Sequence, residues 1–405
     1  MGIDYKRLFH QLILALSRTL DIDEARKLNH GQRAAVLSYY LAQHLCPASL
    51  STVYYSALLH DIGGIGLFDH IVHHPSPVEQ AANPAIRVHP IVGAQIIGSI
   101  PNLEPCVPVI LNHHERYDGH GYPGGKSREK ISLEAQIVRA ADAFDLFIRH
   151  TDNMNRDNIL KAFEYKSGRE ISPALSEHTC GLICDDGIFS IISDDLAVNT
   201  KVKELNRELA GFELPWGMDV IGTLLEVFAQ VIDTKHTYTA GHSQRVSKYS
   251  VHIGLAMELA HDDITKLKWS ALIHDVGKVA VPRSILEGTT GLNAQELAII
   301  RQHPKYTLEV LSCVDELQDL AHFGAYHHER WDGRGYPEGL KGEEIPLPSR
   351  IICIADAFDS LTSDRVYHKA IGTREALCKL SADGGAQFDP QVFDVAKQVL
   401  WSGVV

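Results

Sequence analysis

The sequence has little of what marks a membrane protein, a secreted protein or a binder of nucleic-acid polymers. No stretch approaches the roughly 18 consecutive apolar residues of a membrane-spanning helix, and the apolar run at 12–16 is too short for a secretory signal. The formal net charge of −13 argues against broad binding to nucleic-acid backbones. We therefore expect neither a membrane nor a nucleic-acid polymer as a partner. A small phosphate ligand stays compatible with this charge, because metal ions supply local positive charge.

Cysteine is scarce and lacks the pattern of a disulfide framework. The seven cysteines are odd in number and show no paired motif spacing. Such residues are typical of buried thiols in a reducing compartment. We expect a cytoplasmic location.

Alternation typical of β-strands is also scarce, whereas apolar residues recur at helical spacing almost everywhere. Two amphipathic helices are marked at 8–20 and 221–232. Further helices are expected at 31–45, 50–62, 243–260 and 264–276. Segments rich in proline and glycine at 117–126 and 332–342 predict loops. The sequence therefore predicts an all-α protein.

The length and an internal duplication predict two domains. A chain of 405 residues is too long for one core and suits two domains of roughly 190 residues each. We place an N-terminal domain at 1–196, a short helical connector at 197–214 and a C-terminal domain at 215–405. The connector is too short and too regular for a loose tether, so the N-terminal domain is expected to pack on the C-terminal domain.

The strongest signal is a set of seven metal-ligand residue types that occurs twice in the same order. The second member and all later members recur 214 residues further on, and the first recurs after 212. Ten of the 23 histidines and four aspartates belong to the two sets. A lone histidine is more often an ordinary core or surface residue, but spacing preserved across a duplication is not coincidence. The first set is His30, His60, Asp61, His89, His113, His114 and Asp142, and the second is His242, His274, Asp275, His303, His327, His328 and Asp356.

The chemistry of these residues indicates a polynuclear metal pocket in each half. His60–Asp61 and His274–Asp275 each end an apolar run. Adjacent residues on a helix point about 100° apart, so such a pair can reach two neighbouring ions, and a carboxylate can bridge them. A mixed nitrogen and oxygen set favours Fe, Mn, Zn or Ni over Ca or Mg. The absence of cysteine from both sets argues against a structural zinc site.

The second half resembles the HD-GYP phosphodiesterases over nearly all of residues 220–395. The resemblance implies an all-helical HD fold, a metal centre and hydrolysis of cyclic dinucleotides. It also makes the whole chain two tandem HD-GYP domains of the HD-domain phosphohydrolase type. The matching segments are 240–246 (AGHSQRV), 274–278 (HDVGK), 303–304 (HP), 327–337 (HHERWDGRGYP), 355–359 (ADAFD), 362–367 (TSDRVY) and 385–390 (GAQFDP).

Carried over by position, the resemblance implies two divalent ions in the second half, with Mn, Fe or Ni favoured. The first would be held by His242, His274, Asp275 and Asp356. Asp275 would bridge to a second ion bound by His303, His327 and His328. Some members hold a third ion with a glutamate four residues before the first histidine. This chain has Tyr238 there and Arg26 in the first half, so two ions are expected.

The resemblance also implies the catalytic and substrate-binding residues. Asp275 and Lys278 are the predicted catalytic residues, Lys278 and Arg365 would bind the phosphate, and Tyr336 and Asp359 would contact the nucleotide. In the first half the two phosphate-binding cations become Gly64 and Thr151, whereas Tyr122 and Asp145 remain. The first domain is therefore predicted to be degenerate and regulatory, with a metal site that does not catalyse.

We interpret the chain as a metal-dependent phosphodiesterase that uses a metal-activated water to open a cyclic dinucleotide into a linear 5′-phosphorylated product. The tandem layout looks like the Vibrio enzymes that hydrolyse 3′,3′-cyclic GMP-AMP, which favours that substrate, with cyclic di-GMP next. Two alternatives stay open: a receptor that binds a cyclic dinucleotide without cleaving it, and a general HD-type nucleotide phosphohydrolase. The chain is also compatible with a homodimer.

Overall fold

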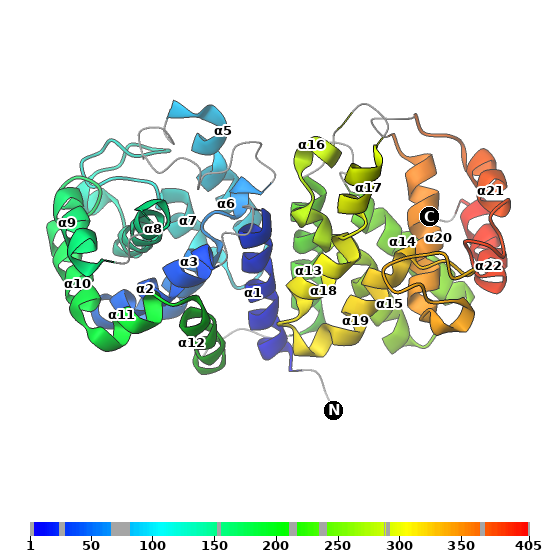
Figure 1. Ribbon diagram of the computed structural model, residues 1–405, viewed down its shortest axis with the longest axis horizontal. Coiled ribbons are helices and arrows are strands. Elements are labelled where there is room, and N and C mark those ends of the chain that lie inside the picture. The colour runs from blue at the N-terminus through cyan, green and yellow to red at the C-terminus, as the bar shows by residue number, and fades with distance from the viewer. Residues whose placement is uncertain are drawn as a thin grey trace. The chain divides into compact units, whose positions relative to one another are not determined.

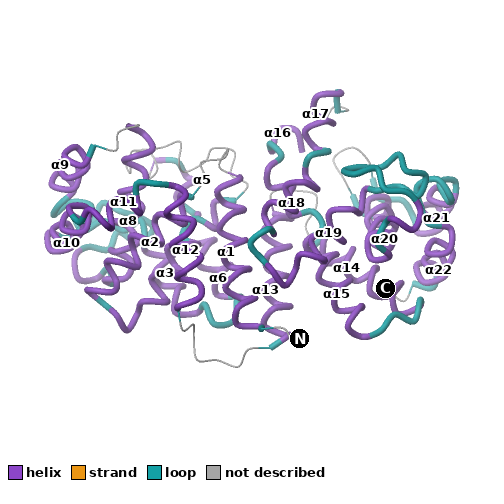
Figure 2. Tube along the Cα trace, turned by 60° about the horizontal axis from the view of Figure 1, so that its bottom comes forward, coloured by secondary structure: helices purple, strands orange, loops and turns teal. Residues whose placement is uncertain are grey.

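The chain is built from helices joined by loops, as Figure 2 shows. The computed structural model describes residues 4–23, 29–65, 82–151, 155–209, 217–234, 241–286, 288, 292–364 and 369–403. Within these ranges, extended pairing is limited to two isolated bridges, one in each half, between Ser167 and Ile171 and between Gly384 and Phe388. The predicted all-α class is confirmed.

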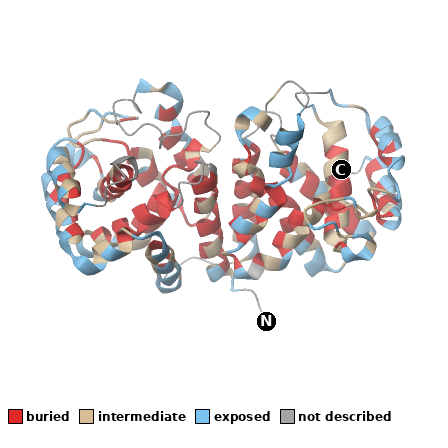
Figure 3. Cartoon of the chain, in the orientation of Figure 1, coloured by how far each residue is buried: buried red, intermediate tan, exposed pale blue. Residues whose placement is uncertain are grey.

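Contacts along the chain separate two compact units, Met1–Val220 and Ile221–Val405 (Figure 1). In each unit the helices carry both buried and exposed residues, and the buried ones lie toward the interior (Figure 3). The domain boundaries at 197–214 stay a prediction. Among the described residues, no helix has the length and apolar character needed to cross a membrane.

The first unit contains the helices α1 (Tyr5–Asp23), α2 (His30–Leu45), α3 (Leu50–Leu59), α5 (Pro84–Arg87), α6 (His89–Gly98), α7 (Val107–Asn112), α8 (Leu133–Thr151), α9 (Arg156–Lys166), α10 (Pro173–Cys184), α11 (Asp186–Ile192) and α12 (Asp195–Glu208). Short 3-10 turns lie between them, of which η2 (Ile62–Gly64) belongs to the site. Helices α2, α3 and α8 pack on one another and form the centre of the unit.

The second unit repeats this order. Its helices are α13 (Met218–Thr234), α14 (His242–Ala256), α15 (His261–Ile273), α16 (Arg283–Leu286), α17 (Ala294–Ile300), α18 (His303–Leu311), α19 (Gln318–Ala325), α20 (Leu347–Thr362), α21 (Thr373–Ser381) and α22 (Pro390–Trp401). The 3-10 turns η6 (Val276–Ala280) and η8 (Tyr326–His328) carry site residues. Here α14, α15 and α20 form the central group, and apolar residues of α21 and α22 complete its core.

The His–Asp pairs lie at the ends of helices, so two predicted helices are shorter than expected. The helix predicted at 50–62 ends at Leu59, and the helix predicted at 264–276 ends at Ile273. His274 keeps helical angles, whereas Asp275 enters the 3-10 turn η6. The turn passes so close to α18 that a Cβ on Gly277 would lie 1.9 Å from the carbonyl oxygen of His303. This contact brings Asp275 next to the start of α18.

Helix α12 covers a face of α2 in the first unit. The residues Val198, Val202 and Leu205 are buried, and the Tyr54 hydroxyl of α3 donates to the Asn206 side chain at 2.9 Å. The predicted helical stretch is therefore present as α12. Because its apolar side is buried on α2, α12 belongs to the first unit rather than standing apart as a linker.

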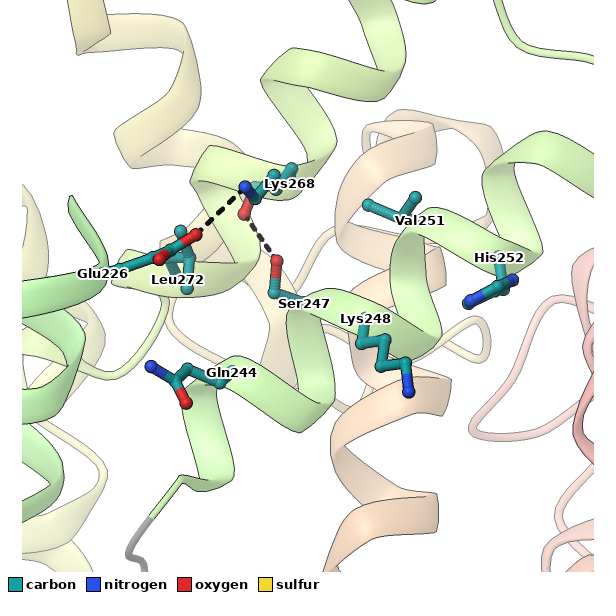
Figure 4. A pocket seen from close by; sticks show the side chains of 8 residues that line it. All are labelled: Glu226, Gln244, Ser247, Lys248, Val251, His252, Lys268 and Leu272. Carbon is teal, nitrogen blue, oxygen red and sulfur yellow. Dashed lines mark hydrogen bonds and ion pairs between the residues drawn. The ribbon is translucent and has the colours of Figure 1, made fainter. Parts of the chain in front are cut away.

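The face of α14 that corresponds to the α12-covered face of α2 carries a surface pocket. Between α13, α14 and α15 lies a surface pocket of about 500 Å³, shown in Figure 4. Lys268 stands where the first unit has Tyr54, and it forms an ion pair with Glu226 at 3.1 Å. Six of its eight lining residues are polar or charged. The residues that line the pocket are Glu226, Gln244, Ser247, Lys248, Val251, His252, Lys268 and Leu272.

Candidate metal centre

The second unit brings its seven predicted ligands together from five elements. His242 begins α14, His274 and Asp275 follow α15, His303 begins α18, His327 and His328 lie in η8, and Asp356 lies in α20. Their ligand atoms form groups in which all members lie within 4.8 Å of one another. Residues more than 110 positions apart in the chain thus share one buried site.

Backbone carbonyls orient the histidine rings. The Nδ1 atom donates to the carbonyl three residues earlier, at 2.7 Å in His274, 2.8 Å in His303 and 2.6 Å in His327. With the proton on Nδ1, the Nε2 atom carries a lone pair directed into the site. This tautomer is the one that a metal ion binds.

Asp275 lies between two groups of histidines. Its Oδ2 atom is 3.3 Å from His274 Nε2 and 3.6 Å from His242 Nε2. Its Oδ1 atom is 3.4 Å from His303 Nε2 and 3.8 Å from His327 Nε2. Each oxygen therefore faces its own group, as required of a carboxylate that bridges two ions.

The arrangement has the unsatisfied atoms expected of a metal centre. Among the described residues, no hydrogen-bond partner exists for the buried Nε2 atoms of His242, His274, His303 and His327 or for Asp275 Oδ1. Leaving such atoms unpaired in the interior is costly. Two nitrogen ligands of one ion, each about 2.1 Å from it at a right angle, lie about 3 Å apart. The distances of 3.3–3.8 Å between the Asp275 oxygens and the facing nitrogens lie within about 1 Å of this value, so the residues fit a pair of ions.

Around Asp275, His303 and His327, the surroundings favour an ionised aspartate and neutral histidines. Burial alone would raise the pKa of Asp275, but His274 and Lys278 hold it well below its usual value. Burial lowers the pKa of His303 to about 4 and that of His327 to about 3. Ligands must be deprotonated to bind a metal, and these groups are so at neutral pH.

In the group formed by His242, His274 and Asp356, the pKa of a histidine is raised instead. Burial would lower the pKa of His242, but the neighbouring carboxylates of Asp275, Asp356 and Asp359 raise it well above its usual value. The surrounding carboxylates therefore favour a positive charge at this place. A divalent ion would supply that charge.

The first unit repeats this geometry around Asp61. Its Oδ2 atom lies 3.4 Å from His30 Nε2 and 3.3 Å from His60 Nε2, and its Oδ1 atom lies 3.2 Å from His89 Nε2 and 3.4 Å from His113 Nε2. The Nε2 atoms of His30 and His60 are 3.1 Å apart, as are those of His89 and His113. Each pair has the spacing of two ligands on one ion. His114 and Asp142 complete the two groups.

The two sites differ in the cations beside them. Lys278 of η6 donates to Asp275 Oδ2, on the oxygen that faces His242 and His274. In the first unit the buried Gly64 occupies this position. The second predicted phosphate-binding residue, Arg365, lies outside the described residues, as do Tyr238 and Arg26. Thr151, the counterpart of Arg365, ends α8.

Tyr336 of the GYP loop lies against the site. Its ring stacks on His328 with centroids 4.8 Å apart, and Tyr122 stacks on His114 at the same distance. The guanidinium of Arg301 lies 5.4 Å from the Tyr336 ring centroid. Sequence reasoning missed Arg301, although the same 214-residue offset places an arginine at Arg87 and could have revealed it.

Asp359, the predicted nucleotide contact, forms hydrogen bonds with protein side chains. It is fully buried, its Oδ2 accepts from His242 Nδ1 at 2.7 Å, and its Oδ1 accepts from Arg245 Nε at 2.6 Å. Both oxygens thus accept hydrogen bonds inside the protein. Asp359 orients His242, and Arg245, which the sequence analysis left without a role, holds Asp359, whereas the contact of Asp359 with a nucleotide stays a prediction. Asp145 has the same relation to His30, at 2.6 Å.

Two helical units, each with an aspartate between two groups of histidines, define a duplicated HD-type site that could hold metal ions. Comparison with known proteins agrees, because the family described as HD domain matches residues 11–165 and 226–392. The chain belongs to this family and carries two tandem HD-GYP domains, as predicted.

Three relatives extend the comparison, all from Vibrio cholerae. The 3′3′-cGAMP-specific phosphodiesterase 3 is 30% identical over 309 residues, which are 76% of this chain and 66% of the relative. The chain thus spans just under two thirds of that protein. Phosphodiesterase 1 of the same specificity is 27% identical over 98% of this chain and 92% of the relative. A crystal structure of a cyclic GMP-AMP-specific phosphodiesterase shares the fold, with a TM-score of 0.68, 23% identity and 98% of both chains covered. The predicted resemblance is confirmed.

Proposed function

We propose that this chain is a metal-dependent phosphodiesterase that opens a cyclic dinucleotide to the linear 5′-phosphorylated dinucleotide in its second domain. The observation that carries the proposal is the position of Lys278. Its ammonium group lies on the bridging carboxylate of a complete set of ligands, where it can also reach a phosphate oxygen. The first domain has the ligands but lacks this cation.

The proposed ligands of one ion are His242, His274, Asp275 and Asp356. Asp275 would also hold a second ion together with His303, His327 and His328. When bound, the ions would supply Lewis-acid stabilisation of the phosphate and an activated water. Mn, Fe or Ni suits this donor set, which contains imidazole and carboxylate and no thiolate.

The residues around the ligands would bind and position the substrate. Lys278 would neutralise charge that develops on the phosphate oxygens, with Arg365 predicted to assist. Tyr336 presents an aromatic ring beside His328, on which a base can stack. Arg301 lies over this ring and is exposed, so it is available to a phosphate or a base.

Among cyclic dinucleotides we favour 3′,3′-cyclic GMP-AMP, with cyclic di-GMP next. Support comes from the two relatives named for this substrate, which align with 76% and 98% of the chain and so include both repeats. The first domain is proposed to be regulatory and to pack on the second. The missing phosphate-binding cations support this role, because Gly64 and Thr151 stand where the second domain has Lys278 and Arg365.

The test is product analysis with protein loaded with Mn²⁺ and given each of the two cyclic dinucleotides separately. Wild type should release the linear dinucleotide, and Lys278→Ala should lose turnover while it keeps its metal. Gly64→Lys is the matched control, because it adds the missing cation to the first domain and should leave the activity of the second intact. Binding without cleavage would favour the receptor function instead, and cleavage of mononucleotides alone would favour a general phosphohydrolase.

A further inference from the structure

The first domain contains a buried cation at a position where the second domain has an uncharged residue. Arg139 of α8 is 2% exposed and is the largest fully buried side chain in the described part of the chain. Its guanidinium donates to Glu170 Oε2 at 2.8 Å and to Asp142 Oδ2 at 2.9 Å. A buried charge persists only when it is paired in this way. Arg139 is therefore a built part of the first site.

The second domain has a neutral pair at the same place. The 214-residue offset brings Arg139 to Cys353. Glu170 corresponds to Gln387, because the amide of Tyr117 donates to the Glu170 carbonyl as the amide of Trp331 donates to that of Gln387. Burial raises the pKa of Cys353 to about 12, so its thiol carries no charge at neutral pH. The two sites thus differ by a whole ion pair.

Arg139 contacts a predicted metal ligand directly. Its Nη1 atom lies 3.1 Å from Nδ1 of His114. Arginine only donates hydrogen bonds, so Nδ1 of His114 must accept, and its lone pair is used. The proton of the neutral ring then sits on Nε2, which has no hydrogen-bond partner among the described residues.

Neither nitrogen of His114 is then available to an ion. Binding through Nδ1 would compete with the guanidinium, and binding through Nε2 would require a proton on Nδ1, which would face the N–H donor of Arg139. The guanidinium would also repel a divalent ion held beside it. At the group formed by His30, His60 and Asp142, Arg139 favours metal binding instead. It orients Asp142 and leaves the Oδ1 atom of Asp142 directed at His30 Nε2, 3.8 Å away.

We infer that Arg139 withdraws His114 from the ligand set, so that the first domain holds one ion where the second holds two. The single ion is bound by His30, His60, Asp61 and Asp142. The full chain then carries three ions. This inference rests on the proposed metal centre and assigns each domain a different metal content.

The test is a metal count on full-length protein after equilibrium dialysis against Mn²⁺. Asp275→Ala removes the bridging ligand of the second site, so this variant reports on the first domain and should hold one ion per chain. In that background, His114→Ala should still hold one ion, and Arg139→Cys with Glu170→Gln should hold two. Two ions in Asp275→Ala itself would overturn the inference, as would a loss of the ion with His114→Ala.

The complementary background separates this inference from the proposed function. Asp61→Ala reports on the second domain and should hold two ions, and adding His328→Ala should reduce the count to one. If Asp61→Ala held none, the proposed metal centre of the second domain would fail. His114→Ala and His328→Ala are matched substitutions at equivalent positions, so unequal effects on the count can only come from the surroundings of the two rings. Circular dichroism will show whether the variant with Arg139→Cys and Glu170→Gln folds. If it does not fold, the comparison of His114→Ala with His328→Ala still decides the inference.

Discussion

The substitution Gly277→Ala, which adds a single methyl group, should disrupt the proposed metal centre of the second domain. Gly277 lies in η6, two residues after Asp275, and its Cα faces the first turn of α18. A Cβ there would lie 1.9 Å from the His303 carbonyl oxygen and 2.4 Å from the Thr307 amide nitrogen. Both contacts are to backbone, so no side chain can rotate away to relieve them.

The size of the disturbance follows from these distances. An ordinary contact begins near 3.4 Å, so the turn and α18 must separate by about 3.4 − 1.9 = 1.5 Å. Metal–ligand distances tolerate only about 0.2 Å. Asp275 Oδ1 and His303 Nε2, now 3.4 Å apart, would move too far from each other to share an ion. Overpacking of this kind costs about 1–3 kcal/mol of stability.

Gly277→Ala in the Asp61→Ala background should therefore hold one ion instead of two. A displacement of about 1 Å can cost a factor of about 100 in rate, so kcat/KM with the cyclic dinucleotide should fall at least that far. The matched control is Gly222→Ala in α13, where a Cβ meets no heavy atom of the described residues within 4 Å. If Gly277→Ala kept both ions and the parental rate, the close approach of η6 to α18 could not be what sets the ligand positions.

Three further predictions concern the ligand supports and the stability of the domains. Asp359→Asn should weaken Mn²⁺ binding about 10–100-fold, because a neutral amide no longer polarises His242; unchanged affinity in a Mn²⁺ titration would contradict the orienting role. Chelation should lower the melting temperature, because an ion at 100 times its dissociation constant stabilises the folded state by about 2.7 kcal/mol; equal melting curves with and without chelator would exclude bound ions. Burial lowers the pKa of His10 to about 4. Between about pH 6.5 and pH 4, His10 is therefore protonated in the unfolded chain but neutral in the folded chain. The free energy of unfolding should therefore fall as the pH drops from 6.5 to 4, and by pH 4.5 wild type should lose about 2 kcal/mol more than His10→Gln. An equal loss in the two proteins between pH 7 and pH 4.5, measured by urea unfolding, would contradict this.

The helices and the ligand set could be predicted because both depend on patterns that are local or repeated. Apolar residues at helical spacing indicate α1 and α13 without knowledge of their neighbours. The offset of 214 residues singles out Asp61 and Asp275 because duplication preserves the spacing of residues that act together. Helix ends were less accurate at Leu59 and Ile273, because the close contact of η2 and η6 with the next helix ends each helix early.

Roles that depend on a particular contact needed the tertiary structure. The HD-GYP resemblance predicts a nucleotide contact for Asp359, but only the packing of α20 on α14 reveals that this residue also accepts a hydrogen bond from His242 and one from Arg245. Arg139 attracted no notice in the sequence, because one arginine on an amphipathic helix is ordinary. Only folding brings it against His114 and Glu170.

The sequence by itself determined that this protein is helical, duplicated and equipped with two sets of metal-ligand residues. Those properties follow from composition, periodicity and spacing, which are visible along the chain. The tertiary structure decided which oxygen of Asp275 faces which histidines and which ring nitrogens are free to bind an ion. Hydrogen bonds and charge pairs act over a few ångströms, so their partners are set by how distant segments pack and not by their order in the chain.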